Sequence, residues 1–182
     1  MWQESTSNIF ENLRFCGPLT YVCVNETELS ALSGAQKLCE TDEEIEYYSN
    51  KLMGLCYCSN VIVTLGEKGC YHLSGGVPND MLAGLQQIRS PQKADGRDDR
   101  SIGVESSGQF YRCDSVVDAV DTTGAGDAFL GAFAAHLSQG SNIDVAIRAA
   151  LHIATESVCG QGAQQSYSRA RDLDARFRVP LS

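Results

Sequence analysis

The sequence predicts an α/β fold, because short apolar runs typical of buried strands alternate along its 182 residues with segments of helical periodicity. An apolar run at residues 19–24 precedes a predicted helix, and a second run at 61–63 follows another. A third run at 116–120 leads into a glycine-rich turn, after which Phe129 and Phe133 recur at helical spacing. Such alternation is typical of a sheet covered by helices.

The composition is that of an ordinary globular protein, with 43% hydrophobic and 20% charged residues. The formal net charge is −9 and Lys and Arg form no cluster, which argues against nucleic acid and anionic membranes as partners. No apolar run approaches the length of a membrane span. Residues 1–4 do not begin a signal peptide, so we expect a cytoplasmic protein, with the nucleus as the alternative.

The cysteines raise the question of disulfides, because their even number could pair completely. They lie mostly in apolar runs, and no Cys-x-x-Cys pair occurs. We therefore expect reduced thiols that serve as small core residues of an intracellular protein. The eight residues are Cys16, Cys23, Cys39, Cys56, Cys58, Cys70, Cys113 and Cys159.

The N-terminal third predicts one strand and two helices after a polar start. Residues 19–24 predict a strand buried on both faces, followed by a helix from about 26 to 33 that ends at Gly34. Thr41 and Glu44 have the spacing of a capping box, which opens the second helix. The apolar side of that helix comprises Ile45, Tyr48, Leu52 and Leu55.

Two further strands are predicted at 60–65 and 70–73, joined by a turn from Gly66 to Gly69. The β-branched residues in the first of these strands are typical of a central position in a sheet. Lys68 in the turn could reach a phosphate, and a solvated turn lysine is the simpler interpretation. The turn itself therefore predicts a ligand contact only weakly.

Residues 74–109 interrupt the pattern with loop formers and charges that show no periodicity. We interpret them as a long loop region, with one or two helical turns at 81–88 and no chemistry of its own. Residues 110–120 then predict one or two strands that lead to the glycine-rich turn.

A second long helix is predicted at 142–159, capped by Ser141 or Asn142 and ended by Gly160. His152 and Glu156 lie four residues apart and could be read as metal ligands. A third ligand at suitable spacing is missing, so an ordinary helix-surface pair is the better interpretation. The inward residues are expected to be Ile143, Ala146, Ile147, Ala150 and Ala154.

The glycine-rich turn carries the clearest chemical signal. Gly124 and Gly126 lack side chains that would keep a ligand off the backbone, and the unpaired N–H groups of the next helical turn point outward. At the positive end of the helix dipole, such a turn suits a phosphate. Asp127 would repel that phosphate unless it accepts a proton from an attacking hydroxyl. The plainer alternative is that Asp121 or Asp127 caps a helix.

Residues 121–127, Asp-Thr-Thr-Gly-Ala-Gly-Asp, resemble the C-terminal signature of the ribokinase-like (PfkB) carbohydrate kinases. Asn25 and Glu28 are similar to the family's Asn-x-x-Glu motif, and residues 64–69 to its Thr-Leu-Gly-x-x-Gly turn. Residues 160–166 resemble the ribokinase branch in particular. The likeness runs from about 19 to about 166 and covers the C-terminal half of such an enzyme.

This resemblance implies a three-layer αβα, Rossmann-like sheet of the ribokinase type, truncated because the N-terminal half and the lid are missing. Residues 1–182 would form a single C-terminal nucleotide-binding domain, with 74–109 as a mobile insertion. In the family the missing half carries most sugar-binding residues. Its absence would leave a sheet edge that self-association or a partner chain could cover.

The implied reaction is the phosphorylation of a sugar hydroxyl by ATP with Mg²⁺. Asp127 would contact the sugar and accept the proton of its hydroxyl. Asn25 would lie near the phosphates, and Glu28 would contact Mg²⁺ through water; spacing alone favours an Asn cap followed by an acidic first turn. The transferring phosphoryl group would be stabilised by the N–H groups of Gly124, Ala125 and Gly126.

Further positions follow from the same resemblance. Leu151 stands where family members usually carry Asn or His near the adenine, which is a departure from the pattern. The implied nucleotide contacts are Thr64, Leu65, Gly66, Glu67, Lys68, Gly69, Gly126 and Asp127. A monovalent cation such as K⁺ would be held, partly through main-chain carbonyls, at Asp121, Thr123, Ser157, Gly160, Gly162 and Ser166.

Three functional hypotheses follow. The first is a ribokinase that converts D-ribose and ATP to D-ribose 5-phosphate and ADP, its activity impaired by the truncation. The second is a catalytically silent domain that binds a nucleotide or a partner chain, which the missing sugar-binding half suggests. The third is a kinase of the same family that acts on fructose or a nucleoside.

Overall fold

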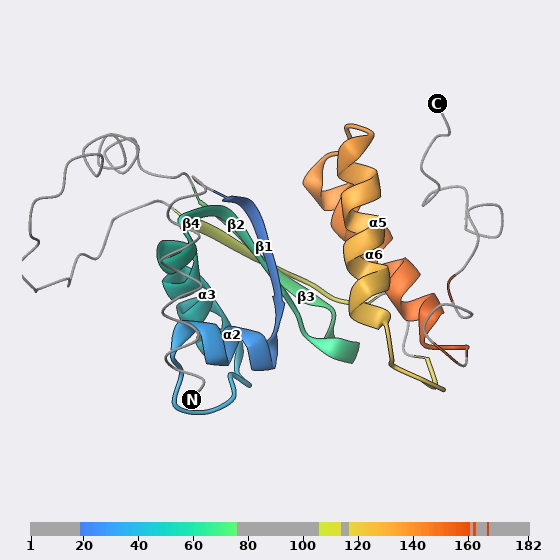
Figure 1. The fold of residues 1–182 in the computed structure, drawn as a ribbon, viewed down its shortest axis with the longest axis horizontal. Coiled ribbons are helices and arrows are strands. Elements are labelled where there is room, and N and C mark those ends of the chain that lie inside the picture. The colour runs from blue at the N-terminus through green and yellow to red at the C-terminus, as the bar shows by residue number, and fades with distance from the viewer. Residues whose placement is uncertain (1–18, 76–105, 114–116, 161, 163–166, 168–182) are drawn as a thin grey trace, which may run out of the picture. The chain divides into compact units, whose positions relative to one another are not determined.

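The computed structural model describes residues 19–75, 106–113, 117–160, 162 and 167, which form a mixed four-stranded sheet and four α-helices (Figure 1). In spatial order the strands are β1 (Leu19–Asn25), β2 (Cys58–Thr64), β3 (Cys70–Gly75) and β4 (Ser106–Tyr111). The helices are α2 (Glu26–Ser33), α3 (Asp42–Cys56), α5 (Ala125–Ser138) and α6 (Ile143–Ser157), with a 3-10 turn η1 (Gly66–Lys68). The predicted α/β class is confirmed.

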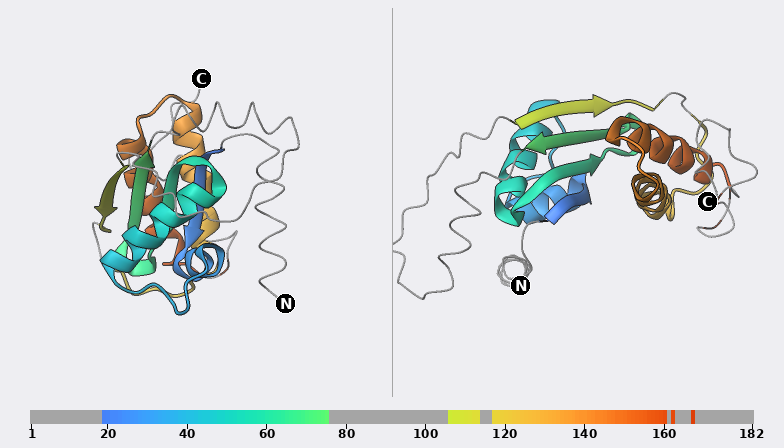
Figure 2. Two further views of the ribbon diagram at one scale, coloured as in Figure 1. Left: turned by 90° about the vertical axis from the view of Figure 1, so that its left-hand side faces the viewer. Right: turned by 90° about the horizontal axis from the view of Figure 1, so that it is seen from above.

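Two compact units make up the chain. The first contains Met1–Val63 and Tyr71–Gln109, and therefore β1, α2, α3 and most of the sheet. The second contains Thr64–Cys70 and Phe110–Ser182, and therefore η1, α5 and α6. Within the sheet, β3 runs opposite to β2 and β4 (Figure 2).

Both helices of the first unit begin at a reciprocal capping box. Thr41 Oγ1 accepts from the Glu44 N–H at 3.2 Å, and Glu44 Oε2 accepts from the Thr41 N–H at 3.3 Å, as the spacing predicts. The hydrogen bond that Lys37 donates to Glu44 lowers the pKa of that carboxyl to about 2, with help from two backbone N–H donors. Gly34, in the left-handed conformation with φ 72°, ends α2 as predicted.

The core of the first unit lies between the sheet and its two helices. α2 packs against α3 and β1, and both helices lie on the same face of the sheet (Figure 2). Leu29 and Leu52 are fully buried, as are residues 61–63 of β2. An interior place in the strand order explains this burial and confirms the central position predicted for that strand.

The prediction that 19–24 is buried on both faces is wrong. Thr20 is exposed, residues 21–23 are partly exposed, and only Val24 is buried. β1 occupies one end of the strand order, where a strand has a neighbour on a single side. An apolar run alone does not reveal whether a strand lies inside a sheet or at its edge.

The bounds predicted around the insertion also need correction. Ser74 and Gly75 belong to β3, and β4 begins at Ser106, four residues inside the segment expected to be an insertion. The helical turns expected at 81–88 lie outside the described residues. Residues 117–120 are not a strand: Val120 is 64% exposed, and its N–H donates to the Val158 carbonyl at 2.8 Å.

The second unit is dominated by the helical hairpin of α5 and α6, which pack side by side (Figures 1 and 2). Asn142 caps α6 by accepting from the Val145 N–H at 2.9 Å, whereas the helix ends at Ser157, earlier than the predicted Gly160. Phe129 and Phe133 stack in the core, with ring centroids 6.2 Å apart. The fully buried face of α6 comprises Ala146, Ile147, Ala149 and Ala150. No helix in the described part of the chain is long and apolar enough to cross a membrane.

A glycine on β4 generates a test of the packing in the first unit. A Cβ atom at Gly108 would lie 1.9 Å from Oη of Tyr71, a side chain that is 1% exposed. We therefore expect Gly108→Ala to lower the free energy of unfolding by about 1–3 kcal/mol, as overpacking does. Urea denaturation followed by circular dichroism measures this change.

Gly54 provides the matched control, because it lies inside α3 and a Cβ atom there would meet nothing within 4 Å. Gly54→Ala should raise the free energy of unfolding by roughly 0.5–1 kcal/mol. Equal effects of the two substitutions would contradict the close approach of Tyr71 to Gly108.

Candidate phosphoryl-binding site

The glycine-rich turn forms the start of α5. Gly124 is the N-cap residue and has φ 84° and ψ 0°, a left-handed conformation that favours glycine. Its carbonyl accepts from the Ala128 N–H at 2.9 Å, which begins the helical hydrogen-bond pattern. No side chain among the described residues caps this helix, unlike α2, α3 and α6. The first-turn N–H groups are therefore directed away from the helix without a side-chain acceptor.

The surface position of the turn is suited to a ligand. Gly126 and Asp127 are exposed, while Gly124 and Ala125 are partly exposed. The Ala125 N–H donates to the Thr122 carbonyl at 3.3 Å, which is long for such a bond. Of the three N–H groups predicted to face a phosphoryl group, that of Ala125 thus has a weak internal acceptor.

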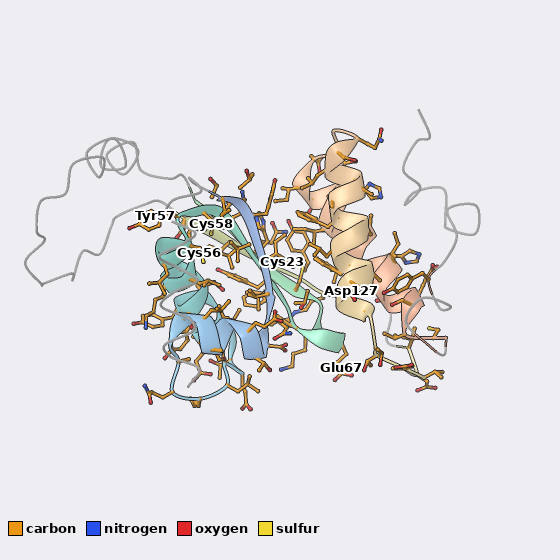
Figure 3. The ribbon with its side chains drawn as sticks, in the orientation of Figure 1. Cys23, Cys56, Tyr57, Cys58, Glu67 and Asp127 are labelled. Carbon is orange, nitrogen blue, oxygen red and sulfur yellow. The ribbon has the colours of Figure 1, made fainter. Side chains whose placement is uncertain are left out.

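Asp127 places a carboxylate in the first turn of the same helix (Figure 3). A carboxylate at this position stabilises the helix, because its negative charge interacts favourably with the positive end of the helix dipole. Since the side chain is exposed and lies beside N–H groups without a side-chain cap, donors suited to an anion and a proton acceptor occur together at the N-terminus of one helix. The side chain of Asp127 does not cap α5, which has no side-chain cap. The plainer alternative, in which Asp127 caps this helix, is therefore not observed.

Asp121 ties the turn to the segment after α6. Its Oδ1 accepts from the Thr123 N–H at 2.9 Å, and its Oδ2 accepts from the Gly162 N–H at 3.1 Å. These N–H donors hold the pKa of the Asp121 carboxyl below its usual value, the bond from Thr123 being the largest cause. Three of the positions predicted for a monovalent cation therefore lie together in the structure.

The other positions predicted for that cation are less informative. Ser157 is buried, and its hydroxyl donates to the Ala154 carbonyl at 2.8 Å. Gly160 is partly exposed, and Ser166 lies outside the described residues. No group of three or more His, Cys, Asp or Glu side chains in the described part of the chain could hold a metal ion. A cation at this place would therefore depend on carbonyl oxygens and one carboxylate.

The predicted nucleotide turn belongs to the same unit as α5. Leu65 donates to the Gly69 carbonyl at 2.8 Å and Gly69 donates to the Gly66 carbonyl at 3.1 Å, so η1 is closed at both ends. Gly69 has φ 103°, and a Cβ atom there would lie 2.0 Å from the Tyr111 carbonyl oxygen. Glu67 and Lys68 are exposed, whereas Leu65 is buried and Thr64 is partly exposed. The glycine at 69 is thus required by backbone packing, with or without a nucleotide.

Asn25 and Glu28 belong to the other unit, at the start of α2. Asn25 Oδ1 accepts from the Glu28 N–H at 2.8 Å, and Glu28 Oε2 accepts from the Asn25 N–H at 3.0 Å. This is the helix cap that spacing alone favours. Glu28 is nevertheless exposed, and its other carboxylate oxygen takes no part in the cap.

Leu151 is only 8% exposed on α6, while the neighbouring His152 is partly exposed. His152 Nε2 lies 3.1 Å from Glu156 Oε1, the helix-surface pair predicted from the spacing. The positions of Leu151 and His152 do not by themselves reveal an adenine contact.

The described cysteines are free thiols, as predicted, and Cys16 lies outside the described residues. Cys23, Cys56 and Cys58 are labelled in Figure 3. Burial raises the pKa of Cys23 and of Cys56 to about 11, and that of Cys58 to about 12. A nucleophilic cysteine requires the opposite shift, because the thiolate is the reactive form. These thiols are therefore packing groups.

One contact to the turn was not expected from the sequence. The hydroxyl of Tyr167 donates to the Gly124 carbonyl at 3.1 Å, although 43 residues separate the two. Residues 167–182 look like a charged amphipathic tail, and a tyrosine within it carries no signal for a partner so far back in the chain.

Known proteins resemble this chain in sequence. The sequence matches the family described as pfkB family carbohydrate kinase over residues 14–92 and 98–170. A deoxyribokinase from Salmonella typhi is 33% identical over 145 residues, which are 79% of this chain and 36% of that protein.

Solved structures agree with the sequence comparison. The crystal structure of a ribokinase from Thermotoga maritima matches with a TM-score of 0.64 and 28% identity, over 92% of this chain and 44% of that one. The ribokinase from Arabidopsis thaliana complexed with ribose and ATP matches with a TM-score of 0.59 and 27% identity, over 81% of this chain and 37% of that one. The chain spans less than half the length of each of these three proteins.

The two bonds of Asp121 generate a test of how the turn is held. An Asn side chain offers one carbonyl oxygen, so Asp121→Asn can keep at most one of the two N–H donors. We expect faster hydrogen–deuterium exchange at Thr123 or Gly162, measured by NMR. Lowering the pH below the usual titration range of an Asp carboxyl should have the same effect in the wild type, because protonation of the carboxyl removes an acceptor. The carboxylate's contribution is present above the unfolded pKa and is lost as the pH falls through the lower folded pKa.

Asp118→Asn is the control, since Asp118 is exposed on the same segment and no hydrogen bond to it occurs among the described residues. Unchanged exchange at both N–H groups in Asp121→Asn would contradict the bridging role of the carboxylate.

Proposed function

The chain belongs to the pfkB family of carbohydrate kinases, and from this membership we propose that it supplies the nucleotide and phosphoryl-transfer site of a ribokinase-type enzyme. The proposed reaction converts D-ribose and ATP to D-ribose 5-phosphate and ADP. The observation that carries the proposal is the uncapped, exposed start of α5, where Asp127 stands beside first-turn N–H groups.

In this proposal Asp127 accepts the proton of the sugar hydroxyl. The hydroxyl oxygen forms a bond to the terminal phosphorus of ATP, while the bond from that phosphorus to the bridging oxygen breaks and ADP leaves. A positioned base of this kind contributes roughly 10²–10⁴-fold in rate. The geometry supports the assignment because the exposed carboxylate lies one residue beyond the glycine turn.

The N–H groups of the turn stabilise the negative charge of the transferring phosphoryl group. Each such donor is worth on the order of 10²–10³-fold in rate when it is aimed at developing charge. The formal net charge of −9 does not favour binding of ATP, so local dipoles rather than a basic surface must attract the phosphates.

Two ions complete the proposal. Glu28, whose carboxylate has one oxygen outside the cap of α2, would contact Mg²⁺ through water, with Asn25 near the phosphates. When bound, Mg²⁺ neutralises phosphate charge. K⁺ would be held near Asp121, Thr123 and Gly162. The hydrogen bonds of Asp121 already join the glycine-rich turn to the segment after α6.

The identity of the sugar is open to a direct comparison. Ribose is favoured by the resemblance of residues 160–166 and by the ribokinase structures, whereas the deoxyribokinase at 33% identity favours 2-deoxyribose. A kinase assay with both sugars at equal concentration distinguishes these two functions through the ratio of their kcat/KM values.

Isothermal titration calorimetry with Mg·ADP tests the nucleotide site itself. Binding at or below millimolar concentration is the expected result. Binding without turnover of any sugar would instead support the alternative of a catalytically silent nucleotide-binding domain. The absence of binding at millimolar nucleotide would contradict the proposal as a whole.

Replacement of the proposed base gives the sharpest test of the mechanism. Asp127→Asn should lower kcat by about 10²–10⁴-fold, since the amide cannot accept the proton. The Kd for Mg·ADP should remain similar, because the N–H groups of the turn are unchanged. A coupled ADP-release assay measures the first quantity and calorimetry the second.

Glu43→Gln serves as the matched control, because Glu43 is an exposed acidic residue in the first turn of α3. Its replacement changes the same helix-dipole interaction without touching the site. A variant Asp127→Asn that keeps full turnover would exclude Asp127 as the base.

A further inference from the structure

The Gly124 carbonyl accepts two hydrogen bonds. The Ala128 N–H donates to it at 2.9 Å from within α5, and the Tyr167 hydroxyl donates at 3.1 Å from beyond α6. A carbonyl oxygen has two lone pairs, so both are used. The direction of this C=O bond is therefore set by two donors, one in the first turns of the same helix and one 43 residues further along the chain.

The same peptide unit carries the Ala125 N–H. A peptide bond is planar, and its N–H points opposite to its C=O. Fixing the Gly124 carbonyl thus fixes the direction of the Ala125 N–H, the first helical donor after the glycine turn. A hydrogen bond to the carbonyl also polarises the peptide, which strengthens its N–H as a donor.

Other contacts from the segment after α6 do not reach this peptide. The Val158 carbonyl accepts from the N–H groups of Val120 and Asp121, and the Gly162 N–H donates to Asp121. These bonds hold the chain before the turn. Tyr167 alone, among the contacts of that segment within the described residues, acts on the turn residue whose peptide continues into the proposed phosphoryl site.

We propose that Tyr167 is a positioning residue of the phosphoryl site, whose hydroxyl orients and polarises the Gly124–Ala125 peptide, so that the Ala125 N–H, whose bond to the Thr122 carbonyl is long at 3.3 Å, also donates to the transferring phosphoryl group. This inference rests on the proposed function. Tyr167 touches neither nucleotide nor sugar in this role; it acts through the backbone of the turn.

The variant Tyr167→Phe removes the hydroxyl and keeps the ring, which is partly buried. Loss of one neutral hydrogen bond corresponds to about a threefold to tenfold effect. We expect the Kd for Mg·adenylyl imidodiphosphate, which has a third phosphoryl group, to rise by about that factor, while the Kd for Mg·ADP changes less than about twofold. A merely structural role would weaken both nucleotides equally.

A second measurement does not depend on nucleotide. In ¹⁵N-labelled protein, the Ala125 N–H resonance should move upfield in Tyr167→Phe, because the peptide is less polarised. Tyr48→Phe is the control, since Tyr48 is a partly exposed tyrosine of α3 in the other unit. It should change neither the Ala125 resonance nor the two dissociation constants.

The outcomes separate the two proposals. If the wild type binds both nucleotides and Tyr167→Phe leaves the triphosphate analogue and the Ala125 resonance unchanged, the positioning role is overturned and the proposed function stands. If the wild type binds neither nucleotide, the proposed function fails, and the role of Tyr167 in a phosphoryl site fails with it. Equal weakening of the two nucleotides also overturns the positioning role.

Discussion

The left-handed conformation of Gly124 is the constraint on which the candidate site depends. With φ 84°, this residue turns the chain so that its own carbonyl starts the hydrogen-bond pattern of α5 while the following N–H groups are left without a side-chain cap. A residue with a Cβ atom would be strained there, by roughly 1–2 kcal/mol. Because the other three helices begin with capping side chains, the bare start of α5 stands out as the place for an external anion.

Local signals explain what the sequence could predict. The capping box at Thr41, the cap at Asn25, the end of α2 at Gly34 and the cap of α6, predicted at Ser141 or Asn142 and found at Asn142, depend on residues a few positions apart, and all four occur in the structure. The central position of β2 follows from three consecutive buried β-branched residues, 61–63. The glycine turn and Asp127 were predicted from the same kind of local pattern, with the family resemblance adding their roles.

The missed features depend on the surroundings of a residue and not on its type. The apolar run that ends at Val120 looks like a strand, yet its backbone pairs with the end of α6. The first four residues of β4, 106–109, include no large apolar residue, and all four are exposed. The alternation of apolar and polar residues that predicts a strand is therefore absent there. The bond from Tyr167 to Gly124 joins positions that no short motif connects.

The sulfur chemistry of the first unit has a practical consequence. With the pKa of Cys56 near 11, roughly one molecule in ten thousand carries its thiolate at pH 7. Because Cys56 is also buried, we expect alkylation of its thiol to require local opening of the structure, whereas Cys159 is exposed. The rate at which Cys56 is alkylated, relative to that of Cys159, therefore reports local opening around Cys56. Mass spectrometry of labelled peptides measures both rates in the same chain.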